Sequence, residues 1–287
     1  MPMSWFTLSW AIFLNGVLFS TASGSIGLNY RKNGVINAGL AGLMYLGGVF
    51  SITFTRLLSL DPYWSVPVCV FVGGLVNIAL NIGYIDLLRR LQSSKIVSLA
   101  SLASFVVLYL MGRGSFWYLI NQGGSTLMIS LLKDKDFTLF TVPGVIIIGI
   151  TTLLFSALLQ FVLSPVVDDG PRGFDKWDAS IYAISGASAC LVGALYPFWF
   201  TGTWQVLLVT PLAGVIVGGV EKKLNPFLGG LFTASFTVWL TSLGRDVVGL
   251  WVTENPYMVA LVLLLISIPL YPRGIVGSIR RIVEYGY

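Results

Sequence analysis

Long apolar stretches separated by short polar links recur along the whole chain. They occupy residues 5–22, 35–55, 66–86, 96–112, 143–163, 179–199, 205–220, 227–243 and 257–271. A helix that crosses a bilayer needs about 20 predominantly apolar residues, and most of the stretches approach that length. The pattern predicts an all-α integral membrane protein, a polytopic bundle of about 8–9 transmembrane helices that forms a single domain over residues 1–287.

Two of the stretches, 205–220 and 227–243, are shorter than a full span and are flanked by the glycine pairs 218–219 and 229–230. Short, Gly/Pro-interrupted segments are typical of broken or re-entrant helices around a translocation path. A tight hairpin of two short but complete spans has the same pattern. Both interpretations remain open.

The composition agrees with a membrane protein. The chain is 56% hydrophobic and 10% charged, whereas soluble domains carry about 25% charged residues. This excludes a soluble enzyme and a nucleic-acid-binding protein. If the N-terminus lies outside and the spans alternate, 12 of the 17 Lys and Arg residues fall in inside links. The positive-inside rule then predicts an external N-terminus and a cytoplasmic C-terminus.

The apolar stretches carry neutral polar residues only, because each Asp, Glu, Lys and Arg falls in a predicted link or at a span end. The chain also has no histidine, the usual proton shuttle and metal ligand. An ion-driven transporter normally needs an ionisable group within its spans. We therefore expect no catalysis, no metal and no cofactor, and an energy source outside this chain. Cys69 and Cys190 are expected to be isolated packing residues.

Seven residues form the candidate substrate path. Asn77 and Asn81 are four apart and share one helix face. They either line a path for a zwitterionic or hydroxylated solute or bond a neighbouring helix, and the second interpretation is favoured. The glycine-rich start of the second stretch suits close helix packing, or binding of a carboxylate at a helix N-terminus. The other candidates are the polar or glycine-rich positions Asn37, Gly39, Gly42, Tyr45 and Gln160.

Four stretches carry a resemblance to a known family. The first is Asn37-x-Gly39-x-x-Gly42 followed by Gly47, and the second is the basic turn at 85–95. The third consists of the glycine pairs at 218–219 and 229–230, and the fourth is the Pro272-Arg-Gly274-Ile-Val-Gly277 ending. In this order, from about residue 14 to 277, the sequence resembles permease subunits of branched-chain amino-acid type ABC importers. It is more loosely similar to the related nucleoside and sugar permeases, although Ala41 stands where the nucleoside branch usually has Glu.

The resemblance implies a multi-pass subunit of the cell membrane. It implies a second, different permease as partner, two cytoplasmic ATPases that carry out the ATP chemistry, and an external solute-binding protein. The solute is most simply a branched-chain or other amino acid.

The segment 164–178 departs from the family. There the family has a longer segment, rich in Arg and Ala, whose helix contacts the ATPase. Here the segment is shorter, carries four Asp against one Arg and one Lys, and has Pro171 between two glycines, which disfavours a helix. The candidate ATPase-facing residues are Asp168, Asp169, Arg172, Asp175 and Lys176.

Three functions remain open. The leading hypothesis is the ABC importer permease. The second is a permease-derived structural or accessory membrane subunit that has lost ATPase coupling. The third is a facilitative channel for a small neutral solute.

Overall fold

The computed structural model describes twelve segments of the chain. They are residues 5–58, 60–85, 94–121, 138–139, 142–163, 176–199, 205–220, 222–247, 251, 254–270, 273–275 and 278–279. Within them the architecture is helical apart from one minimal strand pair, which confirms the predicted all-α class.

The helices follow the predicted apolar stretches closely. The elements are α1 (Trp5–Asn33), α2 (Gly39–Leu57), α3 (Pro62–Leu80), the π-helical turn η1 (Asn81–Ile85), α5 (Ser94–Asn121), α7 (Gly144–Leu163), α8 (Lys176–Trp199), α9 (Gln205–Gly218), α10 (Asn225–Val247), α12 (Tyr257–Ser267) and the 3-10 turn η3 (Ile268–Leu270). Strands β1 (Thr138–Leu139) and β2 (Val142–Pro143) pair antiparallel.

Five helical segments in the described part are long and apolar enough to cross a membrane. They are Leu8–Asn33, Tyr63–Gly83, Gly144–Leu163, Asp178–Trp199 and Asn225–Leu243. Four apolar helices are shorter: Gly39–Thr55, Ser98–Gly114, Gln205–Gly218 and Tyr257–Leu270. The total number of spans and the orientation of the termini stay predictions.

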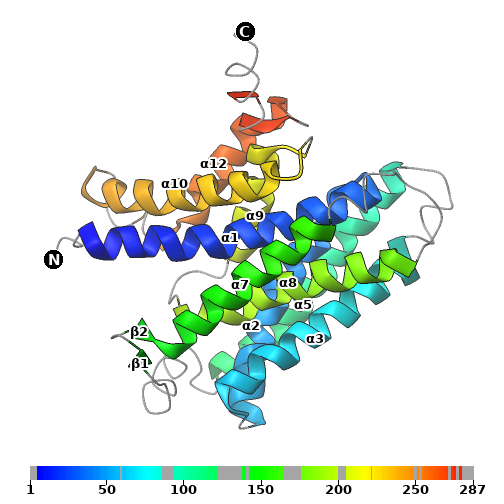
Figure 1. The fold of residues 1–287 in the computed structure, drawn as a ribbon, viewed down its shortest axis with the longest axis horizontal. Coiled ribbons are helices and arrows are strands. Elements are labelled where there is room, and N and C mark those ends of the chain that lie inside the picture. Colours follow the sequence, from blue (N-terminus) through cyan, green and yellow to red (C-terminus); the bar gives the residue numbers. More distant parts are fainter. Residues whose placement is uncertain are drawn as a thin grey trace.

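Helix α8 lies at the centre of the larger group of helices, where it packs against α1, α2, α3 and α7. Helices α9, α10 and α12 pack together as a second group. Helix α1 contacts both groups and joins them into one bundle (Figure 1).

Helix α1 extends further than predicted. The sequence pattern ended the first stretch at residue 22 and placed 23–34 in an inside link, but α1 continues to Asn33. The next residue, Gly34, stops the helix: it adopts φ 70° and donates its N–H to the Tyr30 carbonyl at 2.6 Å. A glycine with positive φ directly after the last helical residue is a common helix terminus. The last turns stay helical because small residues pack closely there: a side chain at Gly27 would meet Pro226.

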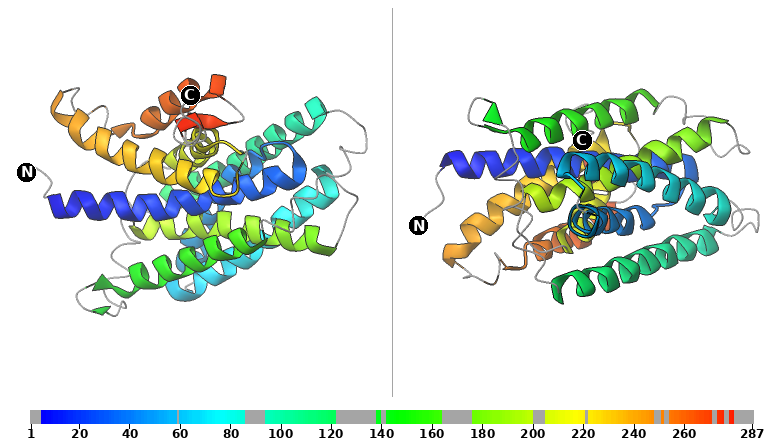
Figure 2. Two further views of the ribbon diagram at one scale, coloured as in Figure 1. Left: turned by 45° about the horizontal axis from the view of Figure 1, so that its top comes forward. Right: turned by 90° about the horizontal axis from the view of Figure 1, so that it is seen from below.

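The two stretches predicted to be short differ in length. Helix α10 has 23 residues, enough for a full span, so the prediction of a short span was wrong here. Helix α9 has 14 residues and is about 21 Å long, less than the bilayer core of about 30 Å. Figure 2 (left) shows α9 nearly end-on while α10 runs across the view, so the helices cross rather than lie parallel.

Glycines let α8 approach α2 and α3 closely. A side chain at Gly193 of α8 would meet the Met44 carbonyl of α2, and one at Gly73 of α3 would meet Cys190 of α8. This packing brings Cys69 and Cys190 into one buried cluster, although the sequence predicted two isolated residues. Both thiols are free.

Candidate functional site

Five asparagines meet at the junction of α1, α3 and α8, and we refer to them as the asparagine cluster. Helix α1 supplies Asn29 and Asn33, the link before α2 supplies Asn37, and α3 and η1 supply Asn77 and Asn81. All five are at most 5% exposed. Buried amides are costly unless they are hydrogen-bonded, so their partners decide what the cluster can do.

The amides of the cluster bond one another. Asn33 Nδ2 donates to Asn29 Oδ1 at 2.7 Å and to Asn81 Oδ1 at 2.9 Å. Asn81 Nδ2 donates to Asn77 Oδ1 at 2.8 Å. An amide carries both donors and acceptors, so neutral side chains from two helices satisfy one another without any charge.

Helix α8 supplies further partners. The Tyr182 hydroxyl donates to Asn33 Oδ1 at 2.8 Å. Asn77 Nδ2 donates to the Tyr182 carbonyl at 2.7 Å and to Ser185 Oγ at 2.9 Å. The favoured interpretation of Asn77 and Asn81, bonding to a neighbouring helix, agrees with these contacts. A role in a substrate path stays a prediction.

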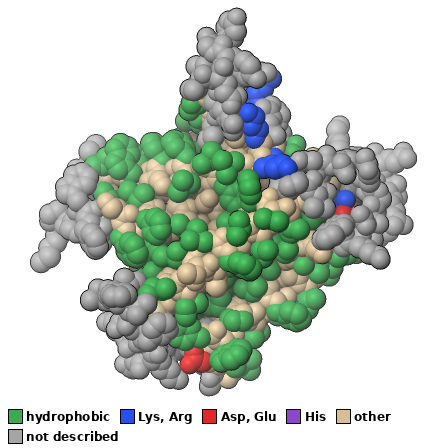
Figure 3. Space-filling view, viewed as in Figure 1, with side chains coloured by type: hydrophobic (Ala, Val, Ile, Leu, Met, Phe, Trp, Pro, Cys, Tyr) green, Lys and Arg blue, Asp and Glu red, His purple; other side chains and the backbone are tan. Residues whose placement is uncertain are grey.

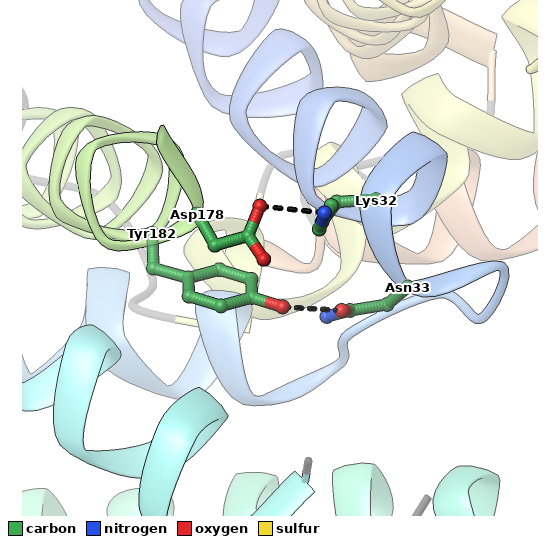
Figure 4. A network of polar contacts seen from close by, with 4 residues as sticks. All are labelled: Lys32, Asn33, Asp178 and Tyr182. Atoms are coloured by element: carbon green, nitrogen blue, oxygen red, sulfur yellow. Dashed lines mark hydrogen bonds and ion pairs between the residues drawn. The ribbon is translucent and has the colours of Figure 1, made fainter. Parts of the chain in front are cut away.

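A buried ion pair lies beside the cluster. Lys32, in the last turn of α1, pairs with Asp178, in the first turn of α8, and their side chains are 9% and 4% exposed (Figure 4). Each charge is at the helix end whose dipole favours it. The sequence pattern places both residues in inside links and therefore gives no sign of this pair. Tyr182 and Asn33 form the next contact along the same two helices.

The π-helical turn η1 follows α3 directly and begins at Asn81. The Asn81 N–H is shared between the carbonyls of Asn77 and Ile78, at the change from α to π geometry. Such turns occur frequently at functional sites. Here the turn places the Asn81 side chain between α1 and α3.

The first amides of α2 are already occupied by protein groups. Asn37 Oδ1 accepts from the Gly39 N–H at 3.0 Å, and Ser101 Oγ of α5 accepts from the Ala38 N–H at 2.8 Å. A carboxylate could bind here only by displacing these oxygens. The glycine-rich start of α2 is closely packed, as one of the two sequence interpretations proposed, since a side chain at Gly39 would approach Ser104 to 3.2 Å.

Gly42 and Tyr45 lie on the face of α2 that packs against α5. A side chain at Gly42 would approach the Phe105 carbonyl to 3.2 Å. The Tyr45 and Tyr109 ring centroids are 5.3 Å apart. The structure therefore places both residues in helix packing, and their role in a path stays a prediction.

Gln160 of α7 lies apart from the asparagine cluster. Its Nε2 donates to Ser25 Oγ of α1 at 3.1 Å, while its buried Oε1 has no hydrogen-bond partner. A side chain at Gly24 would approach this oxygen to 2.7 Å. Gln160 thus joins α7 to α1 rather than to the cluster.

The candidate ATPase-facing residues fall largely outside the described residues. This applies to Asp168, Asp169, Arg172 and Asp175. Lys176 is the first residue of α8.

Helices α9 and α10 contact each other closely through four glycines, which we call the glycine seam. They are Gly214 and Gly218 of α9 and Gly229 and Gly230 of α10. A side chain at Gly229 would meet the backbone of both α9 glycines, and one at Gly230 would meet the Phe19 carbonyl of α1. Glycines at such positions let backbones approach closely.

Gly274 packs against the same region. Gly219 ends α9 with φ 79°, and Gly274 adopts φ 69°. A side chain at Gly274 would approach the Val217 carbonyl to 2.5 Å. Two of the family-like stretches, the glycine pairs and the Gly274 ending, thus meet at the end of α9.

In the described residues the fold is helical apart from one strand pair, and five of its helical segments are long and apolar enough to cross a membrane. Over 291 aligned residues the chain is 24% identical to the "Probable branched-chain amino acid transport permease protein LivH" of Methanocaldococcus jannaschii. The alignment covers 94% of this chain and 91% of that protein. No family model and no solved structure matches the chain. This nearly full-length similarity supports a permease role; the likeness to nucleoside and sugar permeases stays a prediction.

Proposed function

We propose that this chain is a permease subunit of an ABC-type importer of the cell membrane. It would form part of the path for a small polar solute, most simply a branched-chain or other amino acid. The observation that carries the proposal is the similarity to the probable branched-chain amino acid permease over 94% of this chain. The second permease, the two cytoplasmic ATPases and the external solute-binding protein are part of the same proposal.

The asparagine cluster is the best candidate for a solute contact in this scheme. Amide oxygens accept from an ammonium group and amide N–H groups donate to a carboxylate, so the cluster can exchange its internal bonds for bonds to an amino acid. Because its members come from α1, from the link before α2, and from α3 and η1, and bond Tyr182 and Ser185 of α8, the exchange requires α1, α3 and α8 to separate. ATP hydrolysis in the partner subunits would supply the energy, and this chain would carry out no chemistry of its own.

Reconstitution tests the importer proposal. The complex is purified through a tag on this chain and placed in liposomes, and uptake of labelled leucine is measured with and without ATP. We expect uptake that requires ATP and the binding protein. Uptake that continues without the ATPase would contradict the importer and indicate a facilitative channel.

A matched pair of variants tests the role of the cluster. Asn81→Leu removes a fully buried member of the cluster, whereas Asn15→Leu removes an asparagine that donates to the Ala11 carbonyl of its own helix. We expect Asn81→Leu to lower uptake and Asn15→Leu to leave it unchanged. Equal uptake by both variants would remove the cluster from the path.

A structural or accessory subunit is the second candidate function. It is favoured by the acidic segment 164–178, which has four Asp residues. One of these, Asp178, pairs with Lys32 inside the bundle, so it would not contribute to docking. Purification from native membranes decides between the two functions: a bound ATPase eliminates the accessory role, and only unrelated membrane subunits would support it.

A further inference from the structure

A groove of about 660 Å³ runs between α3 and α7, with α8 as its floor. Both wall helices pack against α8 rather than against each other. Only 28% of the residues in the apolar span of α3, and likewise in that of α7, are buried, compared with 83% in the span of α8. The groove is therefore a surface hollow in which the largely exposed helices α3 and α7 flank the buried helix α8.

The lining offers nothing to a polar ligand. It is apolar except for three hydroxyls, and each of these is already bonded. Thr152 Oγ1 donates to the Ile148 carbonyl at 2.8 Å, Ser188 Oγ donates to the Ile184 carbonyl at 2.7 Å, and Ser156 Oγ is 2.5 Å from Ser188 Oγ. Figure 3 shows a largely hydrophobic surface on the face that includes α3 and α7, with charged side chains towards its margins.

The dimensions select the occupant. On α3 the lining runs from Val66 to Ile78, about 18 Å at about 1.5 Å per residue. One leaflet of the hydrocarbon core is about 15 Å thick, half of about 30 Å. An extended acyl chain that lies in one leaflet has this length, so the groove matches one such chain from end to end.

We propose that this groove binds one acyl chain of a membrane phospholipid. An empty hollow would deprive its lining of dispersion contacts, and a hydrocarbon chain restores them without requiring a hydrogen bond. The proposal is independent of the importer function and requires only that α3, α7 and α8 lie in a bilayer.

Photolabelling tests the proposal. The full-length protein is reconstituted into palmitoyl-oleoyl phosphatidylglycerol vesicles that contain a trace of phospholipid with a diazirine in one acyl chain. Labelled residues are identified by mass spectrometry after illumination. The exposed face of α5, for example Val107 (55% exposed), reports contact with bulk lipid. We expect stronger labelling at Leu75 and Phe155, which line the groove, than at Val107.

Two adjacent threonines provide a matched pair of variants. Thr151 and Thr152 are both exposed and both donate to a carbonyl of their own helix, but only Thr152 lines the groove. Thr152→Trp should lower groove labelling about tenfold, the effect of about 1.4 kcal/mol of lost contact, and Thr151→Trp should leave it unchanged. Leu75→Trp, on the opposite wall, replaces Thr152→Trp if that variant does not fold.

Two results would overturn the proposal. Equal labelling of the groove and of Val107 would mean that lipid passes over the groove without binding. A photoreactive residue at Leu75 that cross-links to a second protein chain, with no lipid label in the groove, would mean that a protein segment occupies it.

Discussion

The asparagine cluster and the glycine seam hold helices together by opposite means. In the cluster, side chains cross the space between α1, α3 and α8, and their amides bond one another and the Ser185 hydroxyl of α8. In the seam, side chains are missing, and the backbones of α9 and α10 touch. Helices surrounded by lipid gain no hydrophobic stabilisation from association, so hydrogen bonds and close packing must hold them together. The cluster can exchange partners, whereas the seam has no space for any addition.

The ion pair beside the cluster should give the largest effect. Lys32→Met deprives the buried Asp178 carboxylate of the Lys32 ammonium, and removing one partner of such a pair costs about 3–5 kcal/mol. The free energy of unfolding can be measured by denaturant titration in mixed micelles.

The double variant Lys32→Met with Asp178→Leu is the control for this prediction. It removes both charges and should recover most of the lost stability. A double variant as unstable as the single one would show that the packing of the side chains, rather than the loss of the ion pair, lowers the stability.

The glycine seam should give an intermediate effect. Gly229→Ala forces a methyl group against the backbone of Gly214 and Gly218, and overpacking of this kind costs about 1–3 kcal/mol. The control is Gly114→Ala in α5, where the added methyl group meets no atom within 4 Å. We expect the control to be neutral or stabilised by up to about 1 kcal/mol, the helix propensity difference. Equal losses would attribute the effect to glycine itself and not to the seam.

A single hydroxyl of the cluster should give the smallest effect. Tyr182→Phe removes the hydroxyl that donates to Asn33 Oδ1. The buried amide oxygen then has one hydrogen bond fewer, which should lower the free energy of unfolding by about 1 kcal/mol. Tyr257→Phe removes a similar bond to Asn255 Oδ1 at a partly buried position, where water can replace the hydroxyl. We expect the control to change by less than about 0.5 kcal/mol. Thermal unfolding in detergent measures both, and a larger loss in the control would contradict the buried role of Tyr182.

The sequence was sufficient to locate the helices because apolar stretches of span length have few alternative structures in a bilayer. It was not sufficient at the end of α1, where Ser, Gly and Asn residues looked like a polar link. Asn29, Asn33 and Asn37 are spaced four apart, the same spacing that singled out Asn77 and Asn81. That signal was present, but the assumed link concealed it.

The pairing of Lys32 with Asp178 could not be predicted in the same way. The two residues are far apart in the sequence, and each is also consistent with a solvated link. Only the packing of α1 against α8 brings them together. The seam was easier to anticipate, because paired glycines already indicate close backbones, although the crossing of α9 and α10 depends on the three-dimensional arrangement.

The cysteine cluster provides the chain with a built-in reporter of motion. Cys69 of α3 and Cys190 of α8 are the two cysteines of the chain, and both are fully buried in one cluster. A thiol-alkylating reagent can reach them only when α3 and α8 separate, so the alkylation rate measures the free energy of that opening. The unmodified protein can therefore show whether ATP, a solute or a partner subunit drives these two helices apart.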